Sequence, residues 1–293
     1  MYGYFVDKKL SGSGAYTDLA IERRRADTGL PGVCYTKENS PGGSWERLKI
    51  STKCGAESIG KPIGNYNTLS THRLDMLDSS GIEDVRDEVA KELCSMFDGA
   101  DIFPERILVA GLGNRNLTPD SLGARSADAV KATMQIKDFD LKMFESLNCA
   151  EIAICTPGVA ASSGLDAVIT IKGICDLIKP SAVIAIDALA SRSQARLGST
   201  IQICDTGLSP GSGIGNAKLS VSKETLGVPV IAIGVPTVID SRLLLLNRSE
   251  DDIYSREITS EPMFVSPKEI DDIIKYASQI IGGGINMAFG IFD

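Results

Sequence analysis

The chain has 293 residues, of which 43% are hydrophobic and 23% charged, a composition typical of a globular protein large enough to bury a full core. Its longest apolar stretches fall short of the roughly 20 residues that cross a bilayer, and its N-terminus lacks a signal-peptide pattern, so we expect a cytosolic protein. The formal net charge of −8 argues against direct binding to nucleic acid, whose phosphates would repel it.

The N-terminal part of the chain predicts irregular and strand-rich structure. Residues 1–16 carry Gly12 and Gly14 among small polar residues, and we expect a mobile arm or a removable pro-segment there. Residues 17–80 contain short strand-like runs at 33–38 and 47–52 between turns rich in Gly, Pro and Asn. We therefore expect one α/β domain over 17–293, in which 17–80 could form a sub-lobe.

Strand and helix patterns alternate beyond residue 80, where apolar residues at helical spacing first predict a helix over 82–97. Predicted strands follow at 106–110, 151–155, 181–186, 200–204 and 228–235. Predicted helices follow Pro119, cover 164–178, begin near Ala188, and run from Ser266 to the glycines at 282–284. This alternation predicts an α/β fold, with a mostly parallel central sheet flanked by helices and a small N-terminal strand-rich lobe. The polar segment 247–262 predicts a surface loop.

Two aspartates stand where predicted buried strands end. Asp120 lies in the turn after 106–110, and Asp187 closes the run at 181–186. Ligands of open α/β sheets bind beyond the carboxyl ends of the strands. Two neighbouring carboxylates cannot both ionise easily, so one could activate water while the other protonates a leaving amine. An aspartate after a strand also commonly caps the next helix, and for Asp187 the pattern leaves this alternative open. Asp240, before 241–246, fits the cap better.

The sequence contains few of the residues that other kinds of catalytic site require. His72 is the single histidine and lies in a polar stretch, which excludes an HExxH metal site and disfavours a Ser-His-Asp triad or a Cys-His pair. Seven scattered cysteines without a CxxC disfavour a disulfide framework or a structural zinc site. We therefore predict no resident metal and no cofactor.

A glycine-rich stretch at 205–216, DTGLSPGSGIGN, approaches the dinucleotide-binding pattern GxGxxG. The sixth position is Asn216, and no acidic residue follows about 20 positions on at the end of a second strand. The stretch better fits a loop at the edge of a binding site, whose backbone N–H groups donate hydrogen bonds to an extended peptide or an oxyanion. Candidate substrate-binding residues here are Asp205, Gly207, Gly211 and Gly213.

Several long and unusual blocks occur in order along the chain. They are TDLAIE (17–22), GKPIGNY (60–66), GLGNRNLTPDSLG (111–123), AIDALASRS (185–193), TIQICDTGLSPGSGIGN (200–216), LGVPVIAIGVPTVID (226–240), FVSPKEID (264–271) and GGGINMAF (282–289). Together they resemble the germination protease family of spore-forming bacteria. The two aspartates proposed as catalytic in that family lie in its TPD and AIDALA motifs, which here hold Asp120 and Asp187.

The resemblance implies an atypical aspartic endopeptidase that degrades small acid-soluble spore proteins during germination. It further implies synthesis as a zymogen, assembly as a homotetramer, a cytoplasmic location in the forespore and spore core, and a fold similar to hydrogenase-maturation proteases. The acidic surface of the chain would not repel basic, DNA-coating substrates. Asn114 and Arg115, in the same motif as Asp120, are further substrate-binding candidates.

The chain departs from the family pattern at a few positions. Arg115 stands where the family usually has Trp, Ala124 replaces a usual Pro, and the region 247–262 is shorter. An arginine directed at Asp120 would lower the pKa of that carboxyl. These departures motivate an alternative hypothesis, a catalytically weakened paralogue that binds spore proteins.

Two further alternatives come from other classes of protein. One is a metal-dependent hydrolase with Asp120, Asp187 and Asp205 as oxygen ligands. The other is a nucleotide-binding oxidoreductase that uses the glycine-rich stretch.

Overall fold

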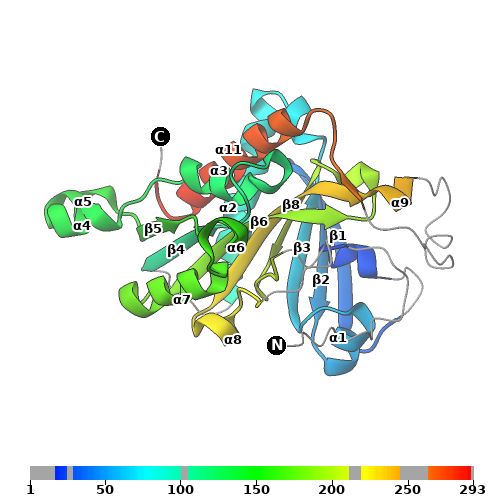
Figure 1. Cartoon of the computed structure of the whole chain (residues 1–293), viewed down its shortest axis with the longest axis horizontal. Helices are drawn as coiled ribbons and strands as arrows, with labels where there is room; N and C mark the ends of the chain where they lie inside the picture. The colour runs from blue at the N-terminus through cyan, green and yellow to red at the C-terminus, as the bar shows by residue number, and fades with distance from the viewer. Residues whose placement is uncertain (1–16, 25–28, 100–104, 211–218, 245–262, 292–293) are drawn as a thin grey trace.

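The computed structural model describes residues 17–24, 29–99, 105–210, 219–244 and 263–291. Within these residues, nine strands form one mixed sheet (Figure 1). Its parallel half consists of β5 (Glu151–Cys155), β4 (Arg106–Gly111), β6 (Ala182–Ser191) and β8 (Val230–Asp240), in that spatial order. Its antiparallel half continues from β8 through β7 (Thr200–Cys204), β3 (Gly64–Ser70), β2 (Gly43–Ile50) and β1 (Val33–Ser40), and β9 (Phe264–Val265) pairs with the end of β8.

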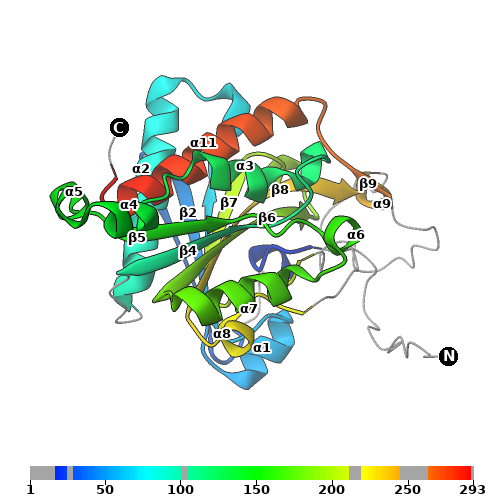
Figure 2. The same ribbon diagram turned by 60° about the vertical axis from the view of Figure 1, so that its left-hand side comes forward.

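Helices cover both faces of the sheet, as Figures 1 and 2 show. One face carries α2 (Ser79–Gly99), α3 (Leu122–Ala129) and α11 (Ile270–Ala288), and the other carries α7 (Ala167–Ile178) and α8 (Lys223–Leu226). Shorter helices are α1 (Lys53–Ile59), α4 (Met134–Phe139), α5 (Leu141–Leu147), α6 (Ala160–Ser163) and α9 (Ser241–Leu244). Four 3-10 turns are described: η1 (Ile21–Arg23), η2 (Leu74–Met76), η3 (Thr118–Asp120) and η4 (Gln194–Arg196). The predicted α/β class is confirmed.

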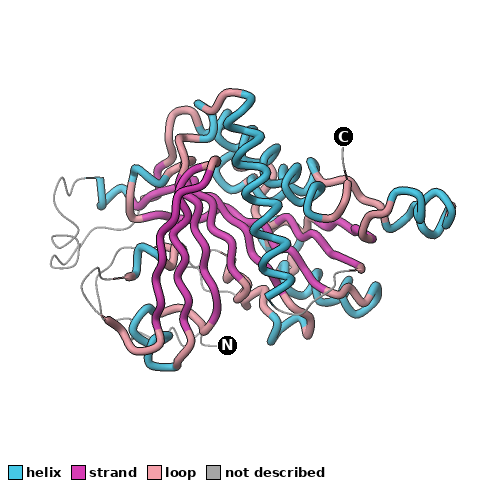
Figure 3. Tube along the Cα trace, turned by 180° about the vertical axis from the view of Figure 1, so that it is seen from behind, coloured by secondary structure: helices cyan, strands magenta, loops and turns pink. Residues whose placement is uncertain are grey.

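The N-terminal strands extend the same sheet. β3 pairs with β7, which places Tyr66 opposite Cys204 and joins β1–β3 to the rest of the molecule. Seen from behind, the strands follow one another as a continuous surface (Figure 3). The predicted N-terminal strands are therefore present, and they make the sheet mixed, with antiparallel pairing on one side of β8.

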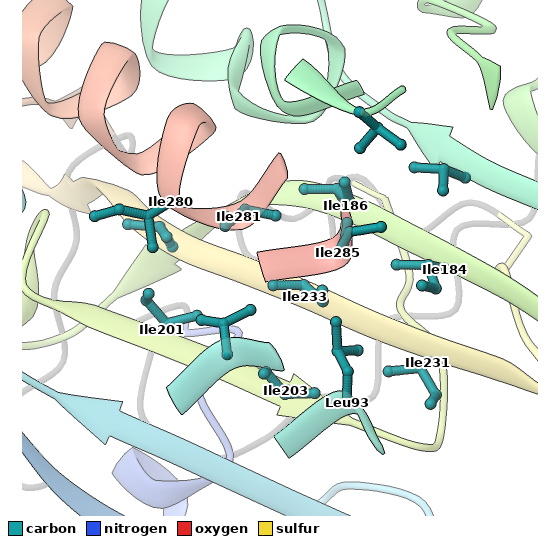
Figure 4. Close-up of a cluster of buried hydrophobic side chains, with 14 of the residues drawn as sticks. Leu93, Ile184, Ile186, Ile201, Ile203, Ile231, Ile233, Ile280, Ile281 and Ile285 are labelled. Carbon is teal, nitrogen blue, oxygen red and sulfur yellow. The ribbon is translucent and has the colours of Figure 1, made fainter. Parts of the chain in front are cut away.

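The main core lies between the sheet and the pair α2 and α11, and isoleucines dominate it (Figure 4). Ile184 and Ile186 of β6 point into this core, whereas Val183 and Ala185 point to the α7 side. Successive side chains of a strand point to opposite faces of a sheet, and β-branched residues fit this pleated, buried surface. The same alternation puts Asp187 on the face that α7 and α8 partly cover.

The helix predicted to begin near Ala188 is wrong, because β6 continues to Ser191. Its last residues pair with β8, with Ala190 opposite Val238 and a register shift after Leu189. The backbone N–H of Asp18 also donates to the Ala190 carbonyl at 2.9 Å. Hydrogen-bonding partners on both sides therefore hold the segment extended, although alanine and leucine favour helices locally.

The predicted helix end at glycines 282–284 is also wrong, because α11 continues to Ala288. These glycines allow close packing of helices. A Cβ on Gly282 would lie 2.5 Å from the Ala129 side chain of α3, and one on Gly284 would lie 2.7 Å from Val89 of α2. Each is far inside van der Waals contact, so only glycine lets α11 approach this closely.

Among the described residues, no helix combines the length and apolarity needed to span a membrane. The predicted arm or pro-segment at 1–16 and the predicted surface loop at 247–262 lie outside the described residues, as do Gly211 and Gly213.

Candidate active site

Asp187 lies inside β6 and not at its end. Its side chain is 6% exposed, and its Oδ1 accepts a hydrogen bond of 2.9 Å from the Ala188 N–H. Because β6 runs on to Ser191, no helix follows that Asp187 could cap, which removes the capping alternative. A buried carboxylate in mid-strand is costly and is retained mainly where it has specific partners or a chemical role.

Asp120 closes a tight loop that follows β4. Its Oδ2 accepts a hydrogen bond of 2.7 Å from the Asn114 N–H, across the loop. Gly113 has φ +88°, and a Cβ there would lie 2.0 Å from the Asp120 carbonyl oxygen. Glycine is therefore required where the two sides of the loop meet. The predicted helix after Pro119 is present as η3 followed by α3.

The Asp120 loop packs directly on the strand that carries Asp187. The Leu112 N–H donates to the Ile186 carbonyl at 2.8 Å, and Gly111 is the last β4 residue paired with β6, opposite Ile186. The Cα atoms of η3 approach within 8 Å of those of both β6 and β8. The chain thus brings both predicted catalytic aspartates to the same edge of the parallel sheet, on neighbouring elements.

A cavity of about 490 Å³ opens beside Asp187, where parallel and antiparallel pairing meet on β8. Its floor is formed by residues of β3, β6, β7 and β8, and its walls by the segment that contains Asp18, the turn at 60–63 and the loop at 205–209. Two predicted substrate-binding residues, Asp205 and Gly207, line it. Asp120, Asn114 and Arg115 are not among its described lining residues.

Asp205 has a structural task besides lining the cavity. Its carboxylate accepts hydrogen bonds from the Asn65 backbone N–H at 2.8 Å and the Asn65 side-chain amide at 2.6 Å. These bonds fasten the end of β7 to the start of β3. The loop that follows turns at Gly207, whose φ is +73°, and Leu208 bridges back to Val221.

Comparison with known proteins gives the site its context. A family model described as germination protease matches residues 16–248. The chain is 37% identical over 309 residues to a germination protease of Caldanaerobacter subterraneus, with 94% of each chain covered. It is 35% identical over 316 residues to one of Clostridium acetobutylicum, covering 93% of this chain and 94% of that one.

The chain belongs to the germination protease family. It is a peptide-bond hydrolase. A germination protease of Bacillus cereus is 39% identical over 240 residues, which cover 79% of this chain and 65% of that protein. Among solved structures, the [NiFe] hydrogenase maturation protease HycI of Thermococcus kodakarensis aligns with 67% of this chain and 96% of its own, at 18% identity and a TM-score of 0.37. The family assignment rests on the sequence matches and not on this alignment.

Arg115, the departure from the germination protease pattern, is directed at Asp128 of α3 and not at Asp120. Its guanidinium forms a two-pronged ion pair with Asp128 and also donates to the Ala124 carbonyl at 3.4 Å. The hydrogen bond from Arg115 lowers the pKa of Asp128. Arg115 is therefore not placed to lower the pKa of Asp120, which removes one of the motivations for a weakened paralogue. The other, the short region 247–262, lies outside the described residues.

The described residues contain no cluster of three or more His, Cys, Asp or Glu side chains placed to hold a metal ion. Asp205 is bound to Asn65, and Asp120 is bound to the backbone of its own loop. The three-aspartate metal site considered as an alternative is therefore not formed by these side chains. His72 is exposed, and Asp240 caps the next turn by accepting from the Arg242 N–H at 3.0 Å.

Sequence reasoning assigned no role to several charged residues that line the cavity, among them Asp18 and Lys61. Asp18 belongs to the segment that runs beside the end of β6, where its Oδ2 accepts from the Ala190 N–H at 2.9 Å. Lys61 follows helix α1 in a turn. Both lie within blocks that resemble the germination protease family, and that resemblance was the only available signal.

Proposed function

We propose that this germination protease is an aspartic endopeptidase that degrades small acid-soluble spore proteins, with Asp120 and Asp187 as its catalytic pair. The observation that carries the proposal is the burial of Asp187 in mid-strand on the face of the cavity. The position of the Asp120 loop against the same strand supports a pair. The substrate class rests on the family resemblance.

In the proposed mechanism, a peptide lies extended along the cavity with its scissile bond near Asp187. One carboxylate removes a proton from water while the water oxygen bonds to the carbonyl carbon. The protonated carboxyl then gives its proton to the amide nitrogen, and the carbon–nitrogen bond breaks. Backbone groups of the loop at 205–209 would hold the peptide, and Gly211 and Gly213, which lie outside the described residues, stay candidates for substrate binding.

The remaining family properties are part of the same proposal. They are zymogen synthesis with activation near the N-terminus, a homotetramer, and action inside the forespore and spore core. The net charge of −8 suits a basic partner and disfavours direct contact with DNA.

The test is cleavage of a purified small acid-soluble spore protein by the wild type, Asp120→Asn and Asp187→Asn. We expect each substitution to lower kcat by about 100-fold or more, since a positioned acid or base contributes about that factor. Asp176→Asn is the matched control, because Asp176 lies on α7 and forms an exposed ion pair with Lys172. Unchanged activity in either site variant would remove the pair, and loss of activity on exhaustive chelation would favour a metal-dependent mechanism.

A further inference from the structure

The backbone of Lys61 is held from three directions. Its N–H and that of Gly60 both donate to the Ala56 carbonyl, at 3.2 and 2.7 Å, as α1 ends. The Arg23 guanidinium donates to the Gly60 carbonyl at 3.3 Å. On the other side of Lys61, the Tyr66 hydroxyl donates to the Pro62 carbonyl at 2.8 Å. The turn that presents Lys61 to the cavity is therefore fixed before any ligand binds.

The Lys61 ammonium, in contrast, forms no hydrogen bond or ion pair with the described residues. Other charged groups of the cavity have protein partners: Asp205 binds Asn65, and Arg23 donates to the carbonyls of Thr17 and Gly60. Lys223 is exposed at the start of α8. Lys61 thus lines the cavity of Asp187 from a fixed backbone turn, and the hydrogen-bonding capacity of its ammonium is unused by the described residues.

We propose that Lys61 binds the scissile carbonyl oxygen of the substrate and stabilises the negative charge that forms on it. This inference rests on the proposed function. When water adds to the carbonyl carbon, the π electrons move to the oxygen, and the negative charge that forms there needs a positive partner. An ammonium that lines the cavity and is partly removed from water supplies one without first breaking a bond to the protein. When the carbon–nitrogen bond breaks, the electrons return and the carbonyl re-forms.

Burial lowers the pKa of Lys61, because removal from water disfavours the charged form, and Arg23 adds to this effect while Asp18 opposes it. The cation is therefore lost at lower pH than for an ordinary lysine, and the activity should fall with it on the alkaline side. Other titratable groups that line the cavity are Asp18, Arg23, Tyr66, Asp187, Cys204, Asp205, Lys223 and Glu224. Burial raises the pKa of the Tyr66 hydroxyl and of the Cys204 thiol.

The experiment measures kcat, KM and their pH dependence for the wild type, Lys61→Met and Lys61→Arg, with a neutral peptide and an acidic peptide as substrates. We expect Lys61→Met to lower kcat by about 100- to 1,000-fold with little change in KM, on both peptides. Lys61→Arg should keep part of the activity and move the alkaline limb to higher pH, because arginine stays charged. Lys142→Met, on the exposed side of α5, is the matched control for the change in charge.

Addition of a small alkylamine tests the role even if the fold of a variant is weakened. The activity of Lys61→Ala should rise with the concentration of ethylamine, and that of Asp187→Asn should not. An effect of Lys61→Met on KM alone, or only on the acidic peptide, would overturn the proposal in favour of a side-chain-binding role. A fully active Lys61→Met overturns it while leaving the aspartate pair intact, whereas a wild type that cleaves nothing contradicts the proposed function itself.

Discussion

Glu22 connects the N-terminal segment to the end of the strand that carries Asp187. Its carboxylate accepts hydrogen bonds from the Ser191 hydroxyl at 2.6 Å, the Arg192 N–H at 2.7 Å and the Ser193 N–H at 3.1 Å. Hydrogen bonds to a charged acceptor are stronger than neutral ones. One side chain therefore positions both the wall of the cavity and the end of the strand that carries Asp187.

Glu22→Gln should lower the free energy of unfolding by about 1–3 kcal/mol, because a carboxylate with several donors is replaced by an amide that presents its own N–H groups to them. We also expect faster proteolytic cleavage near residue 17 and a raised KM, both measurable on one preparation. Glu57→Gln on α1 is the control, since Glu57 is exposed. Equal protease resistance of the two variants would show that Glu22 does not hold the segment.

The sequence could indicate Asp187 and Asp120, because strand-end carboxylates and the family resemblance both pointed to them. It could not indicate Lys61. A lysine between Gly60 and Pro62 looks like an ordinary exposed turn residue, and its surroundings come from Asp18 and Cys204, which are distant in the chain. A side chain whose role depends on contacts between distant segments leaves no local pattern.

At the scale of elements, the space around two helical glycines, one in α11 and one in α7, predicts opposite effects of their substitution by alanine. Gly284→Ala should lower the free energy of unfolding by about 1–3 kcal/mol, because the new methyl group would overlap Val89. In Gly173→Ala, within α7, the new methyl group meets nothing within 4 Å. This substitution should raise the free energy of unfolding by about 0.5–1 kcal/mol, because alanine favours the helix more than glycine does. Thermal or urea unfolding measures both, and two changes of the same sign would contradict the packing argument.

Most elements could be predicted from periodicity, and β7 has the predicted bounds, Thr200–Cys204. The wrong predictions concern the ends of two elements, and tertiary contacts determine where these elements end. β6 extends past Asp187 because β8 and the N-terminal segment pair with it. α11 passes through three glycines because α2 and α3 pack closely against them. In both cases the local sequence favours one structure and the neighbouring element imposes another.

At the scale of the whole molecule, Glu151 links stability to pH. Its carboxylate joins Arg106 of β4, at 2.8 Å, and Lys137 of α4. Burial raises the pKa of Glu151, but the hydrogen bonds from Lys137 and Arg106 outweigh burial, so the pKa lies below its ordinary value of 4.5. A lowered pKa in the folded state means that this stabilisation is present above 4.5 and is lost as the pH falls through the folded-state value.

Glu151→Gln should therefore reduce stability above pH 4.5 and flatten the loss of stability on acidification. The urea midpoint, measured across the acidic range, reports both effects. Glu145→Gln, exposed on α5, serves as the comparison. An acid transition as steep as that of the wild type would assign the pH dependence to other carboxylates.

The floor of the cavity crosses from the parallel to the antiparallel half of the sheet without a break in hydrogen bonding, through β6, β8, β7 and β3. A continuous sheet resists bending about a line between strands, so the two halves cannot open by a hinge motion. Access for a long substrate must then come from movement of the loop at 205–209, since hydrogen bonds hold the turn around Lys61. The cavity thus combines a rigid floor with one loop at its rim, and we expect it to accept a substrate segment in an extended conformation.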